Sequence, residues 1–152
     1  MLITAHDYEV EVTGTGEKTG MLSATVDGLP EMVVASPPQF GGPAHVWSPE
    51  HLFVASIAAC LMTTFRSMAA NSGMEVVDYF DRSTGHLTRA DDGLYSISKV
   101  TLRPTVVISD DSRVERAVRL LEKAEEVCLI GRSVRSETTL EPTVLQPHQV
   151  GT

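Results

Sequence analysis

Apolar and polar positions alternate along the first part of the chain, which is the pattern of half-buried β-strands. Residues 6–13 alternate in part, and shorter runs follow at residues 21–26 and 31–35. The Asp27-Gly28 pair between these two runs is a strong hairpin signal. The pattern therefore predicts a three-stranded antiparallel meander at the start of the chain.

A long apolar segment follows and is predicted to be a helix. Residues 36–47 hold three prolines and two glycines, so they form a loop that leads into it. Ser48 caps free backbone amides, Pro49 fits the first turn, and Glu50 favours the positive end of the helix dipole. Gly73 can end the helix. Its apolar residues occur nearly all round, so we expect a central helix enclosed on most sides.

The second half of the chain is predicted to hold two long strands, a second helix and a last strand. Residues 74–89 form one long strand, and residues 94–107 form its antiparallel return. Residues 110–126 carry apolar side chains on one helical face, and residues 138–145 form the closing strand. This order predicts an α+β fold in which an antiparallel sheet is covered by helices.

The length of 152 residues suits one domain that can bury a core without disulfides or a structural metal. We expect a single domain over residues 1–145 and a frayed tail over residues 146–152. One long apolar helix is a large surface to bury in a chain of this size. Burial alone therefore favours a homodimer.

Charge and cysteine content limit the classes of partner. The net charge of -8 would be repelled by phosphate backbones, which makes nucleic acid an unfavourable partner. The start of the chain has no basic segment or cleavage site of a signal peptide. The uncharged apolar run at residues 52–65 is too short to cross a bilayer, and Arg66 closes it. We therefore expect a cytoplasmic protein with reduced cysteines, without membrane contact, metal or cofactor.

The two cysteines are the candidate chemistry. Cys60 lies within the apolar helix, and Cys128 follows Glu125 and Glu126 near the end of the second helix. Nearby carboxylates raise a thiol pKa, so Cys128 suits a resolving thiol better than a primary nucleophile. Two cysteines on two helices are what a sulfenic acid and disulfide cycle needs. The alternative is that both are inert core residues, because free cysteine is often buried.

The motifs around Cys60 and Cys128 resemble a known family. Ser-Pro-Glu-His-Leu at residues 48–52, followed by Ala-Ala-Cys at residues 58–60, is similar to the signature of the OsmC/Ohr hydroperoxide reductases. Cys128, followed by a closing strand, resembles the second cysteine of that family. The resemblance implies an OsmC-like fold, with antiparallel sheets covering a long buried central helix. It also implies an intertwined homodimer with two sites at the subunit interface.

The same resemblance implies a thiol-dependent peroxidase that reduces organic hydroperoxides and is regenerated by an external dithiol. Cys60 is then the peroxidatic thiol, Cys128 the resolving thiol, and Glu50 the carboxylate that orients a catalytic arginine. A straight helix rises about 1.5 Å per residue, so Glu50 lies about 15 Å from Cys60 along the axis. A long basic side chain or a second subunit must therefore bridge the two.

The expected arginine is the point where this sequence departs from the family. No arginine precedes Arg66. Lys18, His45 and His51 are the candidates to supply positive charge in its place, although lysine lacks the planar fork that pairs bidentately with a carboxylate. Each also has a plain structural or solvated interpretation. The departure keeps open an OsmC-like thiol protein without peroxidase activity that binds a small apolar or electrophilic ligand.

The loop before the helix supplies a candidate substrate pocket. Phe40, Val46 and Trp47 would form an apolar wall suited to lipid-like or aryl hydroperoxides. The alternative is that these side chains pack against the core.

Overall fold

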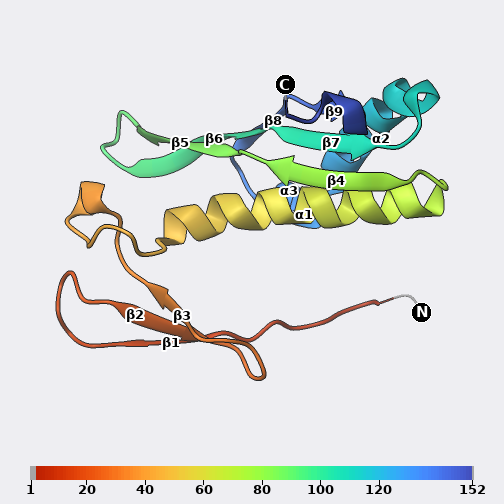
Figure 1. Cartoon of the computed structure of the whole chain (residues 1–152). Coiled ribbons are helices and arrows are strands. Elements are labelled where there is room, and N and C mark those ends of the chain that lie inside the picture. Colours follow the sequence, from red (N-terminus) through yellow and green to blue (C-terminus); the bar gives the residue numbers. More distant parts are fainter. Residues whose placement is uncertain (1–2, 152) are drawn as a thin grey trace. The chain divides into compact units, whose positions relative to one another are not determined.

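The computed structural model describes residues 3–151, and the chain divides into two compact units (Figure 1). The first unit ends at Leu52 and the second begins at Phe53. The expectation of a single domain over residues 1–145 stays a prediction.

The N-terminal unit contains the predicted meander. Strands β1 (Glu11–Gly14), β2 (Leu22–Thr25) and β3 (Met32–Val34) form an antiparallel sheet in that order. Strand β1 begins later than the predicted residue 6. Glu11 pairs with Thr25, and the chain then turns through the bond from the Leu29 amide to the Val26 carbonyl. The residues before Glu11 therefore have no strand opposite them in this sheet.

The loop and the start of the first helix follow the prediction closely. A 3-10 turn, η1 (Pro38–Phe40), interrupts the loop, and the Ala35 amide donates to the Trp47 carbonyl at 2.9 Å. Helix α1 (Pro49–Asn71) begins directly after Ser48, whose Oγ accepts the His51 amide at 3.3 Å. This bond satisfies one of the free amides of the first turn.

The end of α1 is set by Gly73. This glycine adopts a left-handed conformation, with φ +67°, and its amide donates to the Ala70 carbonyl at 3.0 Å. Glycine is the residue that takes up this conformation without a steric penalty.

The C-terminal unit has shorter strands than predicted, arranged in two three-stranded sheets. One sheet has the order β4-β7-β9 and the other β5-β6-β8. The expected strands at residues 74–89, 94–107 and 138–145 are each broken once. Their pieces are β4 (Val76–Asp81) and β5 (Thr84–Arg89), β6 (Tyr95–Leu102) and β7 (Pro104–Ile108), and β8 (Glu137–Leu140) and β9 (Thr143–Leu145).

Polar side chains bridge the three breaks, and their hydrogen bonds explain why the strands are shorter than predicted. Asp81 Oδ1 accepts the Arg103 amide at 3.1 Å and the Ser83 hydroxyl at 2.7 Å. The Arg103 side chain donates to Glu141 at 2.8 Å and to Thr84 Oγ1 at 2.9 Å. The Arg103 amide therefore bonds to a side chain instead of continuing a strand ladder.

The sheets are mixed rather than antiparallel throughout, which corrects a second expectation. Strands β4 and β7 pair antiparallel, as do β5 and β6, but β8 runs parallel to β6 and β9 runs parallel to β7. A parallel pair requires a crossover connection, and the helices between β7 and β8 supply it.

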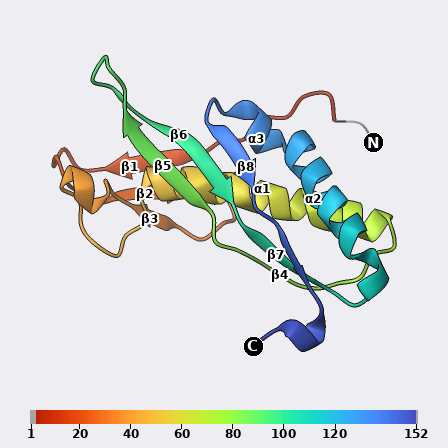
Figure 2. The ribbon, with the colours of Figure 1, turned by 90° about the horizontal axis from the view of Figure 1, so that it is seen from above.

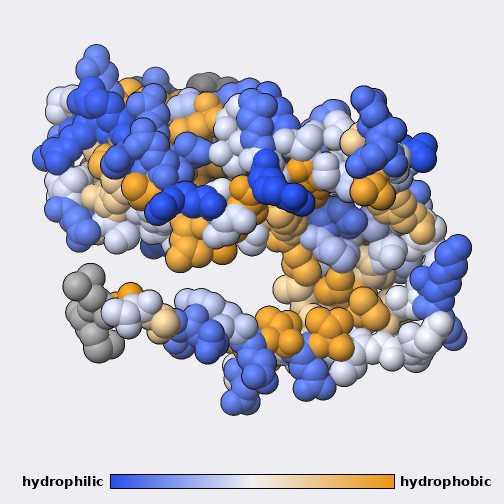
Figure 3. All heavy atoms as spheres, turned by 180° about the vertical axis from the view of Figure 1, so that it is seen from behind, coloured by the Kyte–Doolittle hydropathy of each residue, from blue (hydrophilic) through white to orange (hydrophobic). Residues whose placement is uncertain are grey.

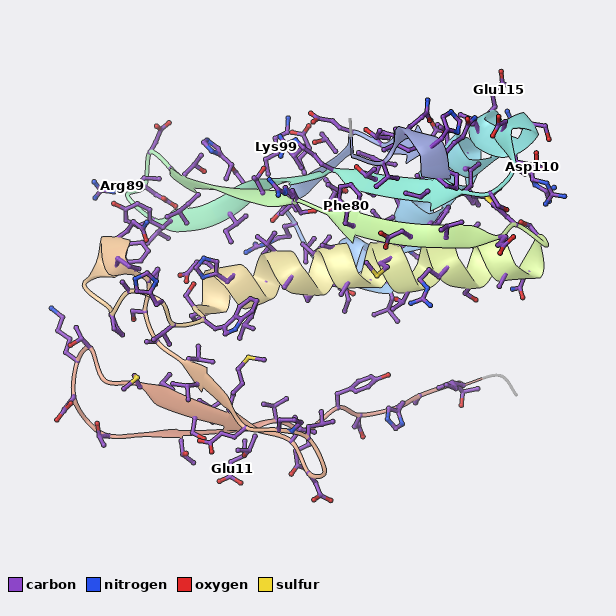
Figure 4. The ribbon with its side chains drawn as sticks, in the orientation of Figure 1. Glu11, Phe80, Arg89, Lys99, Asp110 and Glu115 are labelled. Carbon is purple, nitrogen blue, oxygen red and sulfur yellow. The ribbon has the colours of Figure 1, made fainter. Side chains whose placement is uncertain are left out.

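The crossover consists of three helical segments. They are η2 (Asp111–Arg113), α2 (Val114–Val127) and the short α3 (Leu129–Ser133). The predicted helix over residues 110–126 covers η2 and most of α2, whereas α3 was not predicted. Asp110 and Glu115 lie at the start of this segment (Figure 4). Arg113 Nη1 donates to the Gly73 carbonyl at 2.8 Å, so α2 begins where α1 ends. Figure 2 shows α2 beside the C-terminal half of α1.

One face of α1 is buried in the core of the C-terminal unit. Its buried residues recur every fourth position, and they pack with strands β6 and β7 and with α2. The cluster includes Ile57, Leu61, Phe65, Ala69, Val100, Leu102, Val106, Ile108, Ala117, Leu121 and Ala124. The remaining residues of α1 are half-buried or exposed, so enclosure on most sides is not confirmed within one chain. By length and composition alone α1 could span a membrane, a test that the core helix of a soluble protein also passes.

Apolar side chains are exposed on the N-terminal unit (Figure 3). All four residues of β1 are exposed, and β2 is only half-buried. The large exposed side chains in this unit are Ile3, Tyr8, Val10, Val12, Met21, Leu29, Met32, Val33, Phe40 and Trp47.

After the sheets of the C-terminal unit, the chain forms a further 3-10 turn, η3 (Pro147–Gln149), within the segment expected to fray. Whether that segment frays in solution stays a prediction.

Candidate active site around two cysteines

The helices of the C-terminal unit position both cysteines. Cys60 lies in the middle of α1 and is half-buried, whereas Cys128 is 2% exposed and joins α2 to α3. The Cys128 amide donates to the Glu125 carbonyl at 3.2 Å, which closes α2. The Cys128 sulfur accepts the Gly131 amide at 3.4 Å, which caps the start of α3.

The two sulfurs are brought together, a contact that spacing in the sequence does not reveal. Both thiols are free, and the Cys128 thiol donates a hydrogen bond to the sulfur of Cys60. The amide of Ile130 also donates to Cys60 Sγ, at 3.5 Å. Segment 128–131 therefore contacts both sulfurs, although the two cysteines come from distant parts of the chain.

The surroundings of Cys60 favour its thiolate. Burial by itself raises the pKa of this thiol, but hydrogen bonds from Cys128, the Ile130 amide, the Thr64 hydroxyl and the Leu129 amide outweigh it. The pKa of Cys60 therefore lies below its ordinary value of 9.0. Hydrogen bonds to the charged form of a group stabilise that form.

Cys128 is shifted in the opposite direction. Burial and the hydrogen bond that it donates to Cys60 raise the pKa of Cys128 to about 11. The pair therefore consists of one thiol whose pKa is lowered and one whose pKa is raised, which is the order expected of a nucleophile and a resolving thiol. The predicted influence of Glu125 and Glu126 is not the cause, because the causes are burial and the contact with Cys60.

Three of the groups that lower the pKa of Cys60 were not predicted from the sequence. Thr64 stands four residues after Cys60, a spacing that places two side chains on one helical face. That spacing was the available signal for Thr64. The amides of Leu129 and Ile130 carried no signal, because the short helix α3 was not predicted.

Glu50 lies in the first turn of α1, as predicted. Its Oε2 is buried and has no hydrogen-bond partner within residues 3–151. Lys18 is exposed in the connection between β1 and β2. The role of Glu50 and any substitution of Lys18 for an arginine stay predictions.

His51 and His45 have distinct surroundings in the N-terminal unit. His51 Nδ1 lies 2.8 Å from Ser48 Oγ, and its ring meets Trp47 edge-on with centroids 6.2 Å apart. His45 is exposed and has φ +63°, a conformation that is uncommon for residues other than glycine. These observations give His51 a structural role at the helix start and leave the charge role of both histidines a prediction.

The predicted apolar wall is brought together only in part. Val46 and Trp47 line an open hollow of about 570 Å³ in the N-terminal unit, but Phe40 lies on η1 and is not among its lining residues. The other lining residues are Leu29, Pro30, Glu31, Met32, Val33 and His45.

Within residues 3–151, no group of three or more His, Cys, Asp or Glu side chains is arranged to hold a metal ion.

The family follows from a comparison with known families. Residues 42–143 match the family described as OsmC-like protein, and this range includes both cysteines and the helix that carries Cys60. The chain belongs to the OsmC-like protein family. The resemblance drawn from the Ser-Pro-Glu-His-Leu motif and the cysteines is therefore confirmed.

Two of the proteins similar to this chain have no stated function. The chain is 28% identical to the uncharacterized protein YmaD of Bacillus subtilis over 111 residues, which is 71% of this chain and 73% of that protein. It is 27% identical to the OsmC-like protein of unknown function VCA0330 from Vibrio cholerae, with a TM-score of 0.77 over 90% of this chain and 99% of that one.

A third relative carries a functional name. The chain is 25% identical to an organic hydroperoxide resistance protein OsmC from Legionella pneumophila, with a TM-score of 0.68. The match covers 93% of this chain and 99% of that one. An α+β fold is thus common to this chain and to solved OsmC-like structures, and the family includes proteins named for hydroperoxide resistance.

Proposed function

We propose that this OsmC-like protein is a thiol-dependent peroxidase that reduces organic hydroperoxides through Cys60 and Cys128. The observation that carries the proposal is that the consecutive amides of Ile130 and Gly131 donate to the sulfurs of Cys60 and Cys128 at 3.5 and 3.4 Å. The lowered pKa of Cys60 and the raised pKa of Cys128 support it. A nucleophilic thiol must ionise at working pH, and its partner must remain nearby until the first oxidation is complete.

The proposed cycle has three steps. The Cys60 thiolate attacks the outer oxygen of ROOH, the O–O bond breaks, and the products are Cys60 sulfenic acid and an alkoxide that takes up a proton to give ROH. The Cys128 thiol then attacks the sulfenic sulfur, forming a disulfide and releasing water. An external dithiol reduces the disulfide by exchange, regenerating both thiols and becoming oxidised itself.

The relative from Legionella pneumophila named for organic hydroperoxide resistance supports the substrate class. The apolar residues of the hollow in the N-terminal unit are also suited to an organic peroxide rather than to hydrogen peroxide. We propose no cofactor for the cycle, because the two thiols and the external dithiol account for its electrons.

The test is stopped-flow oxidation of the reduced protein by cumene hydroperoxide and, separately, by hydrogen peroxide. Wild type, Cys60→Ser and Cys128→Ser are compared by thiol titration and mass. We expect fast oxidation that disappears in Cys60→Ser, and a sulfenic acid with one added oxygen atom in Cys128→Ser. Oxidation no faster than that of a free thiol in all three proteins would refute the peroxidase.

A second candidate function rests on the missing arginine. Glu50 Oε2 is buried without a hydrogen-bond partner in the described chain, and no arginine precedes Arg66. The alternative is a thiol protein without peroxidase activity that binds a small apolar or electrophilic ligand near Cys60. A peroxide-inert protein whose Cys60 is nevertheless alkylated rapidly by apolar electrophiles would favour this alternative.

We propose an intertwined homodimer as the working form. The exposed apolar side chains of the N-terminal unit and the incompletely buried surface of α1 support it, because patches of this kind in soluble proteins mark interfaces. Sedimentation as a monomer at micromolar concentration in the analytical ultracentrifuge would count against the dimer.

We also propose a cytoplasmic location without nucleic-acid or membrane partners. The net charge of -8 opposes binding to phosphate backbones, and free cysteines suit a reducing compartment. Recovery of the protein in the membrane fraction, or binding to duplex DNA at physiological salt, would contradict this part of the proposal.

A further inference from the structure

The hollow in the N-terminal unit contains a carboxylate among apolar side chains. Its volume is about 570 Å³, and Glu31 lines it together with six apolar residues and His45. None of the described residues that line it is a lysine or an arginine. In a mostly apolar site, the few polar groups decide which ligands are accepted. The charge of Glu31 therefore bears on the charge of the ligand that the hollow admits.

Glu31 is held in place by the neighbouring strand. It directly precedes β3, and its Oε1 accepts the hydroxyl of Ser23 on β2. This bond limits the rotation of the carboxylate. Within residues 3–151, no salt bridge includes Glu31. Its negative charge is therefore not balanced by a cationic side chain of the described chain.

Trp47 is the second group in the hollow that favours a cation. Its side chain lines the hollow and is 52% exposed. The face of an indole ring attracts cations, and aromatic faces recognise quaternary ammonium groups in proteins. A carboxylate and an indole in one apolar hollow therefore complement a ligand that combines an apolar body with a positive charge.

We propose that this hollow selects apolar ligands that carry an ammonium group and disfavours those that carry a carboxylate, with Glu31 and Trp47 as the selecting residues. The inference rests on the proposed function in taking the hollow as the place where an organic peroxide binds. It adds the class of that peroxide, an organic hydroperoxide with a cationic rather than a carboxylate end. A second copy of the chain in the proposed homodimer must leave the hollow accessible.

The experiment uses the fluorescence of Trp47 in the full chain. Trp47 is the single tryptophan of the sequence, so its emission reports on the hollow directly. The probes are octyltrimethylammonium, octanoate and octanol, which have similar tails and differ in charge, each titrated below the concentration at which it forms micelles. The titrations are made at about pH 8, where imidazole groups are generally uncharged. None of the probes is a peroxide, so binding is measured apart from the chemistry of the cysteines.

Two substitutions separate the local charge from the net charge of -8. Glu31→Gln removes the charge from the hollow and nearly keeps the shape of the side chain. Glu17→Gln is the matched control, because Glu17 is exposed in the connection between β1 and β2 and does not line the hollow. Both variants change the net charge equally, and circular dichroism confirms that each is folded.

We expect the emission of Trp47 to move to shorter wavelength as a tail covers the ring, with octyltrimethylammonium binding more tightly than octanol and octanoate least tightly. An exposed ion pair contributes about 0.2–1 kcal/mol. Glu31→Gln should therefore weaken octyltrimethylammonium binding by about twofold to fivefold and strengthen octanoate binding, while Glu17→Gln changes neither.

Three results would overturn the proposal. They are an emission of the wild type that no probe alters, equal affinities for the ammonium and carboxylate probes, and an equal effect of Glu31→Gln and Glu17→Gln. The last result would assign the preference to net charge rather than to the hollow. Failure of Cys60 to react with peroxides refutes the proposed function, and the binding result with these probes stays valid beside it.

Discussion

The amide nitrogen of Ile130 lies 3.5 Å from the sulfur of Cys60 and donates to it. One residue later, the amide of Gly131 donates to the sulfur of Cys128 at 3.4 Å. Consecutive amides at the start of α3 therefore contact the two thiols separately. The helical turn after Cys128 therefore contacts both sulfurs, which supports the proposed role of Cys128 as the resolving thiol.

The first prediction concerns selective alkylation of the cysteines. The pKa of Cys60 is lowered from 9.0, mainly because donated hydrogen bonds outweigh burial, and the pKa of Cys128 is raised to about 11. Alkylation requires the thiolate, so the rate at Cys60 rises as pH increases through its lowered pKa, while Cys128 stays protonated. Iodoacetamide at about pH 8 should therefore label Cys60 and spare Cys128 in the folded protein.

Peptide mass spectrometry measures this selectivity, and unfolding in urea is the control. Both cysteines should be labelled once the chain is unfolded, because the shifts depend on folded contacts and Cys128 is 2% exposed in the fold. Equal labelling of the two residues in the native protein would contradict the assignment of Cys60 as the nucleophile.

The second prediction concerns the start of α1. Ser48 is fully buried, and its Oγ accepts the His51 amide at 3.3 Å. Loss of a helix cap typically costs about 1 kcal/mol, so Ser48→Ala should lower the free energy of unfolding by roughly that amount. Ser48→Thr keeps the hydroxyl and should cost less. Urea denaturation measures both, and equal stabilities of the alanine and threonine variants would show that the hydroxyl does not act as a cap.

Local signals in the sequence were sufficient to predict α1. Its start was predicted from Ser48 and Pro49 and its end from Gly73, and the helix spans Pro49–Asn71. These signals act on neighbouring backbone groups, so their effect is largely independent of the rest of the fold. The three strands of the N-terminal unit were predicted for the same reason, since alternation and the Asp27-Gly28 turn are local.

The breaks in the long strands could not be predicted in this way. Each break depends on bonds between residues far apart in sequence, such as that from the Arg103 amide to Asp81. The candidate site shows the same difference between what local motifs predict and what distant contacts determine. The two cysteines and Glu50 were identified from motifs, whereas the contact between the sulfurs depends on how α2 and α3 return along α1. Segment 129–133 is too short to give a helical pattern of its own.

The third prediction concerns the close approach of β5 to α1 in the C-terminal unit. A Cβ added to Gly85 would lie 2.5 Å from Val54 Cγ2 and 3.3 Å from Ile97 Cγ2. Valine is stiff at χ1 and cannot swing aside easily. Gly85→Ala should therefore destabilise the protein by about 1–3 kcal/mol through overpacking.

Two comparisons make this third prediction specific. Gly16→Ala is the control, because a Cβ there meets no atom within 4 Å, and we expect a change below about 0.5 kcal/mol. Val54→Ala opens space opposite Gly85, so the double variant should be more stable than the sum of the two single effects implies. Simple additivity in urea denaturation would place the cost of Gly85→Ala elsewhere.

The fourth prediction concerns the junction between the two sheets of the C-terminal unit. Asp81 Oδ1 accepts both the Arg103 amide and the Ser83 hydroxyl, at 3.1 and 2.7 Å. Asp81→Ala leaves these donors without their acceptor, so we expect a loss of about 1–3 kcal/mol in the free energy of unfolding. Asp81→Asn keeps a carbonyl oxygen in place and should lose less than half as much.

The salt bridge at the same junction provides the contrast. Arg103 and Glu141 are 2.8 Å apart, but their side chains are 42% and 61% exposed, so Glu141→Gln should cost at most about 1 kcal/mol. Added salt should reduce that cost further, whereas the cost of Asp81→Ala should change little, because it reflects the loss of an acceptor rather than of exposed charge. Urea denaturation at low and high salt separates the two. A larger effect for Glu141→Gln than for Asp81→Ala would mean that the ion pair, and not the acceptor on β4, holds the sheets at their junction.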